Sequence, residues 1–223
     1  MPNLSLRRLI LVPALVTLAV TLVRLTGELL LWSPSLFSRE AGGGGALVGI
    51  VWLIPVFGIL FGLSLARAGQ APASVGKALG WAFLAFVLNT ALAIGAFTLV
   101  PSPVAQLAIF GIGSWLAILL ARRGWDVLWR VLLVYGLAAR IPVLVIMFLS
   151  IFGGWDTHYT KPRPDFPPMG AWGLFFWTAF LPQMSIWIYL TIVGGMIFGA
   201  LAVGIRRLVG KPAPAAAPSS VSL

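Results

Sequence analysis

Two oppositely charged side chains stand four residues apart in a stretch that is otherwise almost entirely apolar, "LVRLTGELLLW" at 22–32. They are Arg24 and Glu28. Residues four apart share one face of an α-helix, so the spacing predicts an ion pair. A charged group near the centre of a membrane costs about 2.5–3.5 kcal/mol on insertion scales, so such groups face a bundle interior, a water-filled cavity or a partner. The stretch is therefore a candidate polar site.

A second isolated cation, Arg140, lies within the apolar run 131–152, just before Pro142. Two arginines against one carboxylate leave a positive charge that an anion or a lipid headgroup phosphate would balance. We expect Arg24, Glu28 and Arg140 to form one coupled group that faces the bundle interior, with Asn89 and Gln183 completing a polar lining. The alternative is a purely structural network that holds the helices in register.

The chain's only histidine, His158, lies in "WDTHY" at 155–159, two residues after Asp156. These two side chains are candidates for a carboxylate–imidazole pair, and a hydrogen-bonded or pH-responsive loop is the alternative. A zinc site needs three or four protein ligands, whereas the chain has one histidine and no cysteine. The sequence therefore predicts no metal and no cofactor, and it excludes a thiol nucleophile.

The composition indicates which elements must position these groups. The chain is 60% hydrophobic and 9% charged, with a mean hydropathy of +1.03, which is typical of an integral membrane protein. Each long apolar run holds about the 20 residues that a helix needs to cross a hydrocarbon core about 30 Å thick. The sequence predicts an all-α bundle of six transmembrane helices within residues 1–209, at 9–31, 46–66, 78–100, 104–121, 131–152 and 183–205.

The net charge of +10 follows from the bias of basic residues toward cytoplasmic loops, so we expect the lipid bilayer, and no nucleic acid, as partner. With the N-terminus inside, ten basic residues face the cytoplasm: Arg7, Arg8, Arg67, Lys77, Arg122, Arg123, Arg130, Arg206, Arg207 and Lys211. Three face out: Arg39, Lys161 and Arg163. This bias predicts an inner-membrane protein with both termini cytoplasmic.

Two further segments have distinctive composition. Residues 171–205 are too long for one perpendicular crossing, and Pro182 lacks the N–H of a continuing helix, so we expect an interfacial half-helix at 171–181. The tail 210–223 is rich in Pro, Ala and Ser, which predicts disorder.

Glycines with a spacing of four residues let helices approach closely. They occur as Gly45/Gly49, Gly58/Gly62 and Gly195/Gly199, in spans two and six. The pattern predicts that these spans pack together, either within the chain or across a homodimer or a membrane complex.

The favoured function is non-enzymatic: binding or transport of a small anion or amphiphile, or a subunit role in a membrane complex. The site would lie near the outer face, covered by loops 33–46 and 153–170. The alternative is a membrane-embedded enzyme acting on a lipid-linked substrate, with Glu28 or the Asp156/His158 pair as acid or base. A contact between Glu28 and His158 at one cavity would favour the enzyme.

Overall fold

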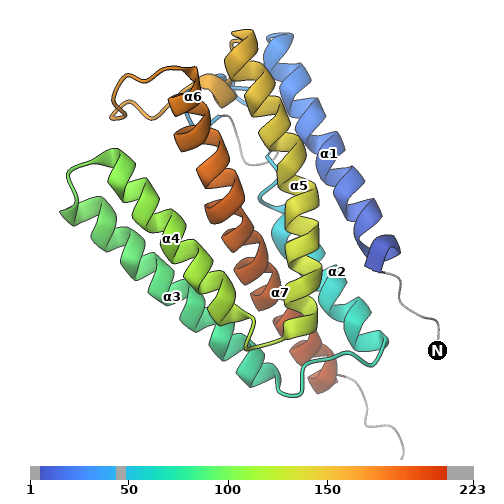
Figure 1. The fold of residues 1–223 in the computed structure, drawn as a ribbon. Coiled ribbons are helices and arrows are strands. Elements are labelled where there is room, and N and C mark those ends of the chain that lie inside the picture. The colour runs from blue at the N-terminus through green and yellow to red at the C-terminus, as the bar shows by residue number, and fades with distance from the viewer. Residues whose placement is uncertain (1–5, 44–48, 210–223) are drawn as a thin grey trace, which may run out of the picture.

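The computed structural model describes residues 6–43 and 49–209, and within these ranges the regular structure is entirely helical (Figure 1). The predicted tail 210–223 lies outside the described residues. Five helical segments are long and apolar enough to cross a membrane, which suggests a membrane location. They are α1 (Leu6–Leu29), α3 (Val75–Leu99), α4 (Pro103–Ala121), α5 (Asp126–Gly153) and a final run, Ala171–Val209.

The second span differs from the prediction. Helix α2 runs only from Leu53 to Arg67, 15 residues, or about 22 Å at 1.5 Å per residue. Residues 44–48 lie outside the described part of the chain, and residues 49–52 form a bend and a turn. Pro55 stands at the third position of α2, in the first turn, where its missing N–H removes no hydrogen bond of the helix. The expected start at residue 46 is therefore wrong.

The final run is continuous, so the expected break before Pro182 is also wrong. It comprises α6 (Ala171–Leu174), the π-helices η3 (Phe175–Phe180) and η4 (Pro182–Ile186), and α7 (Trp187–Val209). Proline removes one N–H donor and crowds the carbonyl one turn earlier, and local π geometry can absorb both effects in a long apolar helix. An interfacial position for residues 171–181 stays a prediction.

Helix α7 lies between the α3–α4 pair and α5 (Figure 1), and it packs tightly against α2. A Cβ atom added to Gly58 would lie 2.8 Å from the Cα of Gly195, and one added to Gly62 would lie 2.7 Å from the Cα of Gly199. The predicted packing of spans two and six through glycines is therefore confirmed within one chain. A partner chain would have to use another surface.

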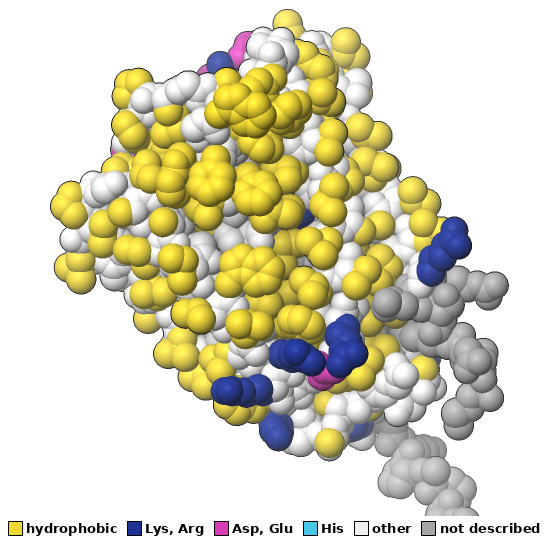
Figure 2. All heavy atoms as spheres, in the orientation of Figure 1, with side chains coloured by type: hydrophobic (Ala, Val, Ile, Leu, Met, Phe, Trp, Pro, Cys, Tyr) yellow, Lys and Arg dark blue, Asp and Glu magenta, His cyan; other side chains and the backbone are white. Residues whose placement is uncertain are grey.

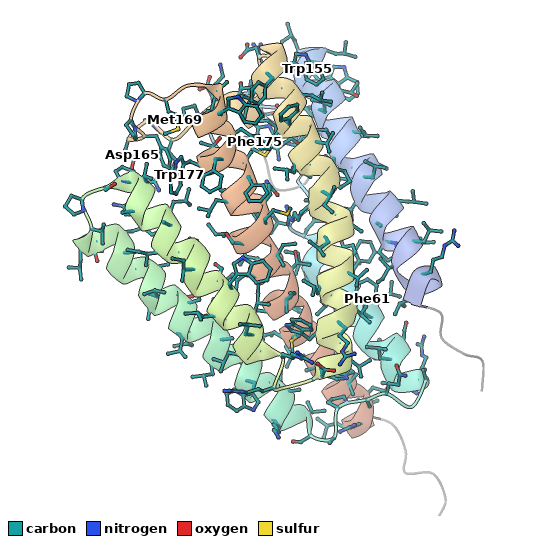
Figure 3. All side chains as sticks on the ribbon, in the orientation of Figure 1. Phe61, Trp155, Asp165, Met169, Phe175 and Trp177 are labelled. Atoms are coloured by element: carbon teal, nitrogen blue, oxygen red, sulfur yellow. The ribbon has the colours of Figure 1, made fainter. Side chains whose placement is uncertain are left out.

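The two ends of the bundle differ in composition. Figure 2 shows a broad hydrophobic face with Lys and Arg side chains gathered at the lower end, where Arg122, Arg123 and Arg130 are exposed. Figure 3 places Phe61 among the helices in the lower half, whereas Trp155 and Phe175 lie at the upper end. The loop between α5 and α6 therefore covers the end that is opposite the basic cluster.

Candidate ligand-binding site

The ion pair on α1 forms as the spacing predicted. Arg24 Nε donates a hydrogen bond of 3.0 Å to Glu28 Oε1. Glu28 is fully buried, and Arg24 is 9% exposed. The pair sits in the last turns of α1, which ends at Leu29.

The carboxylate partner of His158 is Glu28. The backbone N–H of His158 donates to Glu28 Oε2 over 3.0 Å, and His158 Nδ1 lies 2.5 Å from Glu28 Oε1. Burial lowers the pKa of His158 below its ordinary value of 6.5, so the imidazole is neutral at pH 7. Nδ1 and Oε1 do not have hydrogen-bond geometry, but a ring proton on Nδ1 is the tautomer that suits a neighbouring carboxylate, and it leaves Nε2 as the basic nitrogen for a ligand.

Asp156, a candidate partner of His158, instead forms ion pairs with Arg39 and, over 2.8 Å, with Lys161. The reason is local: His158 begins a 3₁₀ turn, η2 (His158–Thr160), that turns toward Glu28, while Asp156 stays exposed. The hydrogen bond from Lys161 lowers the pKa of Asp156. Because Arg39 follows α1, these pairs tie segment 33–43 to the loop after α5.

Of these groups, Arg24, His158 and Lys161 line a cavity of about 540 Å³. Its polar wall combines residues from α1, α5, the outer loop and the final helical run: Arg24, Arg140, His158, Tyr159, Lys161 and Gln183. Its apolar wall contains Ile50, Val51, Val143 and Met147. The volume lies within the range of about 300–1,000 Å³ that is usual for small-molecule sites.

Contrary to the prediction, Arg140 does not join the ion pair between Arg24 and Glu28. Its guanidinium carbon lies 4.7 Å from the centre of the Trp187 ring, and it makes no ion pair with any residue that the structure describes. Arg140 is 4% exposed, yet its Nε has no hydrogen-bond partner within the described chain, and neither has Arg24 Nη2. Buried donors of this kind are costly unless water or a ligand satisfies them.

Gly43 brings the backbone of the first outer segment directly over Arg24. Its φ is +72°, and a Cβ atom there would lie 1.7 Å from Arg24 Nη2 and 3.0 Å from His158 Cδ2. Only a glycine permits both this conformation and this approach. The expectation that loop 33–46 covers the site is consistent with this contact.

The two amide side chains that were predicted to line the site, Asn89 and Gln183, lie at different places. Gln183 lines the cavity, and its Oε1 has no partner in the described residues. Asn89 does not reach this cavity: its Nδ2 donates to Ser114 Oγ over 3.2 Å, beside a separate hollow of about 260 Å³ between α3 and α4. Asn89 was placed at the middle of the third span and Gln183 at the start of the sixth, but periodicity alone does not say which neighbour a helix face meets.

Sequence reasoning missed Tyr159 and Trp187 as lining residues. Trp187 stands four residues after Gln183, so helical spacing could have identified it. Tyr159 follows His158, and its ring centre lies 3.8 Å from that of the imidazole.

Comparisons with known proteins identify no relative. No protein-family model, curated protein or solved structure matches the chain. Function must therefore be inferred from the chemistry of the cavity itself.

Proposed function

We propose that this chain is a six-span inner-membrane protein whose cavity, near the outer face, binds a small anion or an anionic amphiphile. One observation carries the proposal: Arg24 and Arg140, on two different helices, line one cavity, and each has a buried N–H group that lacks a partner in the described residues. Both oxygens of Glu28 are already engaged by Arg24 and His158. An anionic ligand would satisfy the free donors with charge-assisted hydrogen bonds.

Six crossings with cytoplasmic termini are supported by the exposed arginines at the end opposite the cavity. The absence of native cysteine makes the topology simple to test. In intact cells, an impermeant thiol reagent should label Ala41→Cys and Pro167→Cys, but not Ala73→Cys. Labelling of Ala73→Cys from outside would overturn the orientation.

Binding is favoured over passage because the bundle below the cavity is filled. The ring of Tyr135 packs against Phe57 and Phe61, with centres 5.3 Å apart in both pairs. At the same depth, next to Phe57 and Phe61 in the sequence, Gly58 and Gly62 bring α2 against α7. None of these three aromatic residues lines the cavity, and within the described residues they fill the bundle at the depth of Tyr135.

A binding measurement in detergent tests the proposal. Oleate and dioleoylphosphatidylglycerol should raise the unfolding temperature of the wild-type protein, and uncharged dioleoylglycerol should not. Arg140→Gln should abolish the shift, whereas Arg130→Gln, which changes an exposed arginine paired with Asp126, should leave it intact. Equal shifts in the two variants would refute anion binding at this cavity.

The contact between Glu28 and His158 favours one second candidate, an enzyme that acts on a lipid-linked substrate. A buried carboxylate that fixes the imidazole tautomer makes the other ring nitrogen an effective general base. Incubation with a total membrane-lipid extract should then convert one lipid species over time. Conversion should cease in His158→Gln, and an unchanged lipid profile with the wild-type protein would exclude this candidate for the lipids present.

A further inference from the structure

The charges around the cavity do not cancel. Three cations line it, Arg24, Arg140 and Lys161, and Arg39 joins them through Asp156. Against these four stand two carboxylates, Glu28 and Asp156, so the group carries a net charge of +2. Glu40 is exposed and forms no ion pair within the described residues, and residues 44–48 have no charged side chain.

His158 does not change this balance at neutral pH. Burial lowers its pKa, and its ring proton faces Glu28. A monoanionic ligand would therefore leave the group with a charge of +1, whereas a dianion would neutralise it.

The donors also come from different directions. Arg24 belongs to α1, Arg140 to α5, and Tyr159 and Lys161 to the outer loop. Burial raises the pKa of Tyr159 to about 12, so its hydroxyl remains available as a donor. A planar carboxylate presents two oxygens, but a terminal phosphate presents three that point apart, which suits donors on several walls.

The remaining wall suits an apolar chain. The cavity that the cations line is also lined by four apolar side chains: Ile50, Val51, Val143 and Met147. The volume of about 540 Å³ far exceeds what one ion needs, since a water molecule occupies about 30 Å³ of liquid.

We infer that the cavity recognises a terminal phosphate dianion, the headgroup of a phosphomonoester whose apolar tail lies along this wall. This inference rests on the proposed anion binding and narrows its ligand class. The guanidinium groups of Arg24 and Arg140 supply the central hydrogen bonds, and Lys161 contacts the phosphate from the rim. Diester headgroups, which carry one charge and two free oxygens, bind more weakly.

The test compares four probes by native mass spectrometry and thermal unfolding in detergent at pH 7.5. They are dioleoylphosphatidic acid, dioleoylphosphatidylglycerol, dioleoylglycerol and inorganic phosphate. Phosphatidic acid should bind at least about tenfold more tightly than phosphatidylglycerol, and the preference should shrink below about pH 6, where a phosphomonoester loses its second charge. Equal affinity for the two phospholipids would overturn the inference.

Inorganic phosphate separates the two sources of a phosphate dianion. Weak binding of inorganic phosphate supports a lipid phosphate, because the apolar wall then contributes. If inorganic phosphate binds as tightly as phosphatidic acid, the recognition of a phosphate dianion is supported, and the proposed contact between an apolar tail and the cavity wall is wrong.

Variants connect the preference to the named donors. Arg140→Gln should reduce the affinity for phosphatidic acid at least about tenfold, and Arg130→Gln serves as the matched control. Lys161→Gln, in an exposed loop position, should remove most of the preference over phosphatidylglycerol even if Arg140→Gln folds poorly. If oleate and both phospholipids bind equally and all depend on Arg140, the proposed function survives and the phosphate inference fails. If none depends on Arg140, both fail.

Discussion

Glu28 holds His158 at two points: one carboxylate oxygen accepts the backbone N–H over 3.0 Å, and the other lies 2.5 Å from Nδ1. The two residues are 130 positions apart. The end of the first helix is therefore fastened to the loop between α5 and α6 by a buried carboxylate, and the same carboxylate positions Arg24.

Replacing Glu28 should destabilise the protein strongly. Glu28→Gln leaves Arg24 buried without a counterion, and breaking a buried pair in this way costs about 3–5 kcal/mol. For a chain of this size, the unfolding temperature should fall by roughly 10 °C in detergent. Glu40→Gln is the control, because Glu40 is exposed. Similar small effects of both substitutions would show that the buried pair contributes little.

The effects of Glu28→Gln and Arg140→Gln on stability should add. Arg140 stacks on Trp187 and makes no ion pair within the described chain, so the two side chains have no shared partner. Without ligand, the double variant should equal the sum of the single changes within about 0.5 kcal/mol. A saturating anion that touches both Arg24 and Arg140 should make the same cycle non-additive. Strong coupling in the absence of any ligand would contradict the observed separation.

Stability should fall as the pH drops below about 6.5. Burial lowers the pKa of folded His158 from 6.5, so in this window the unfolded chain binds a proton that the folded protein does not. The stabilisation is thus complete above pH 6.5 and is lost as the pH falls toward the lowered pKa. Unfolding temperatures of the wild type and His158→Gln, measured between pH 8 and pH 5, should differ in slope only in the acidic range. Parallel curves would mean that His158 keeps its ordinary pKa.

Two neighbouring glycines allow a matched test of whether the close approach of Gly43 to Arg24 matters for binding. Gly42 and Gly43 both have positive φ, +86° and +72°, so alanine strains the backbone equally at either position. Only at Gly43 would the new Cβ collide with the Arg24 guanidinium. Gly43→Ala should therefore weaken oleate binding several-fold more than Gly42→Ala, because Gly42 also lines the cavity but its new Cβ would meet no atom within 4 Å. Equal losses in both variants would assign the effect to backbone strain.

Much of this arrangement follows from local sequence, and the exceptions have physical causes. The Arg24–Glu28 pair could be predicted because both residues lie on one helix, and the glycine contacts because their spacing defines one face. The partner of His158 could not, because no local rule decides between Asp156 two residues away and Glu28 in another helix. Hydropathy likewise located the apolar runs but did not reveal that α2 begins only at Leu53, or that π geometry accommodates Pro182.

Asn89 shows the same limit for the candidate site. A polar residue in the middle of an apolar run suggests a common polar centre, yet a bundle has several faces at the same depth. The rotation of α3 about its axis points Asn89 toward Ser114, to which it donates a hydrogen bond. Gln183, in the final helical run, lines the cavity instead. The depth of a residue in the membrane follows from its position along the span. The neighbouring helix that its side chain faces depends on how the helices pack.

The π-helical turns in the final run also fix a rotational register. Successive residues of an ordinary helix are offset by about 100°, so the deletion of one residue within Phe175–Phe180 would turn Trp172 and everything before it by about that angle relative to α7. The loop that carries His158 joins the run at this end. Thr178 lies in η3 and lines the cavity. An insertion or deletion between Thr178 and α7 would therefore rotate this side chain away from the cavity and leave the residues of α1 and α5 that line it unchanged.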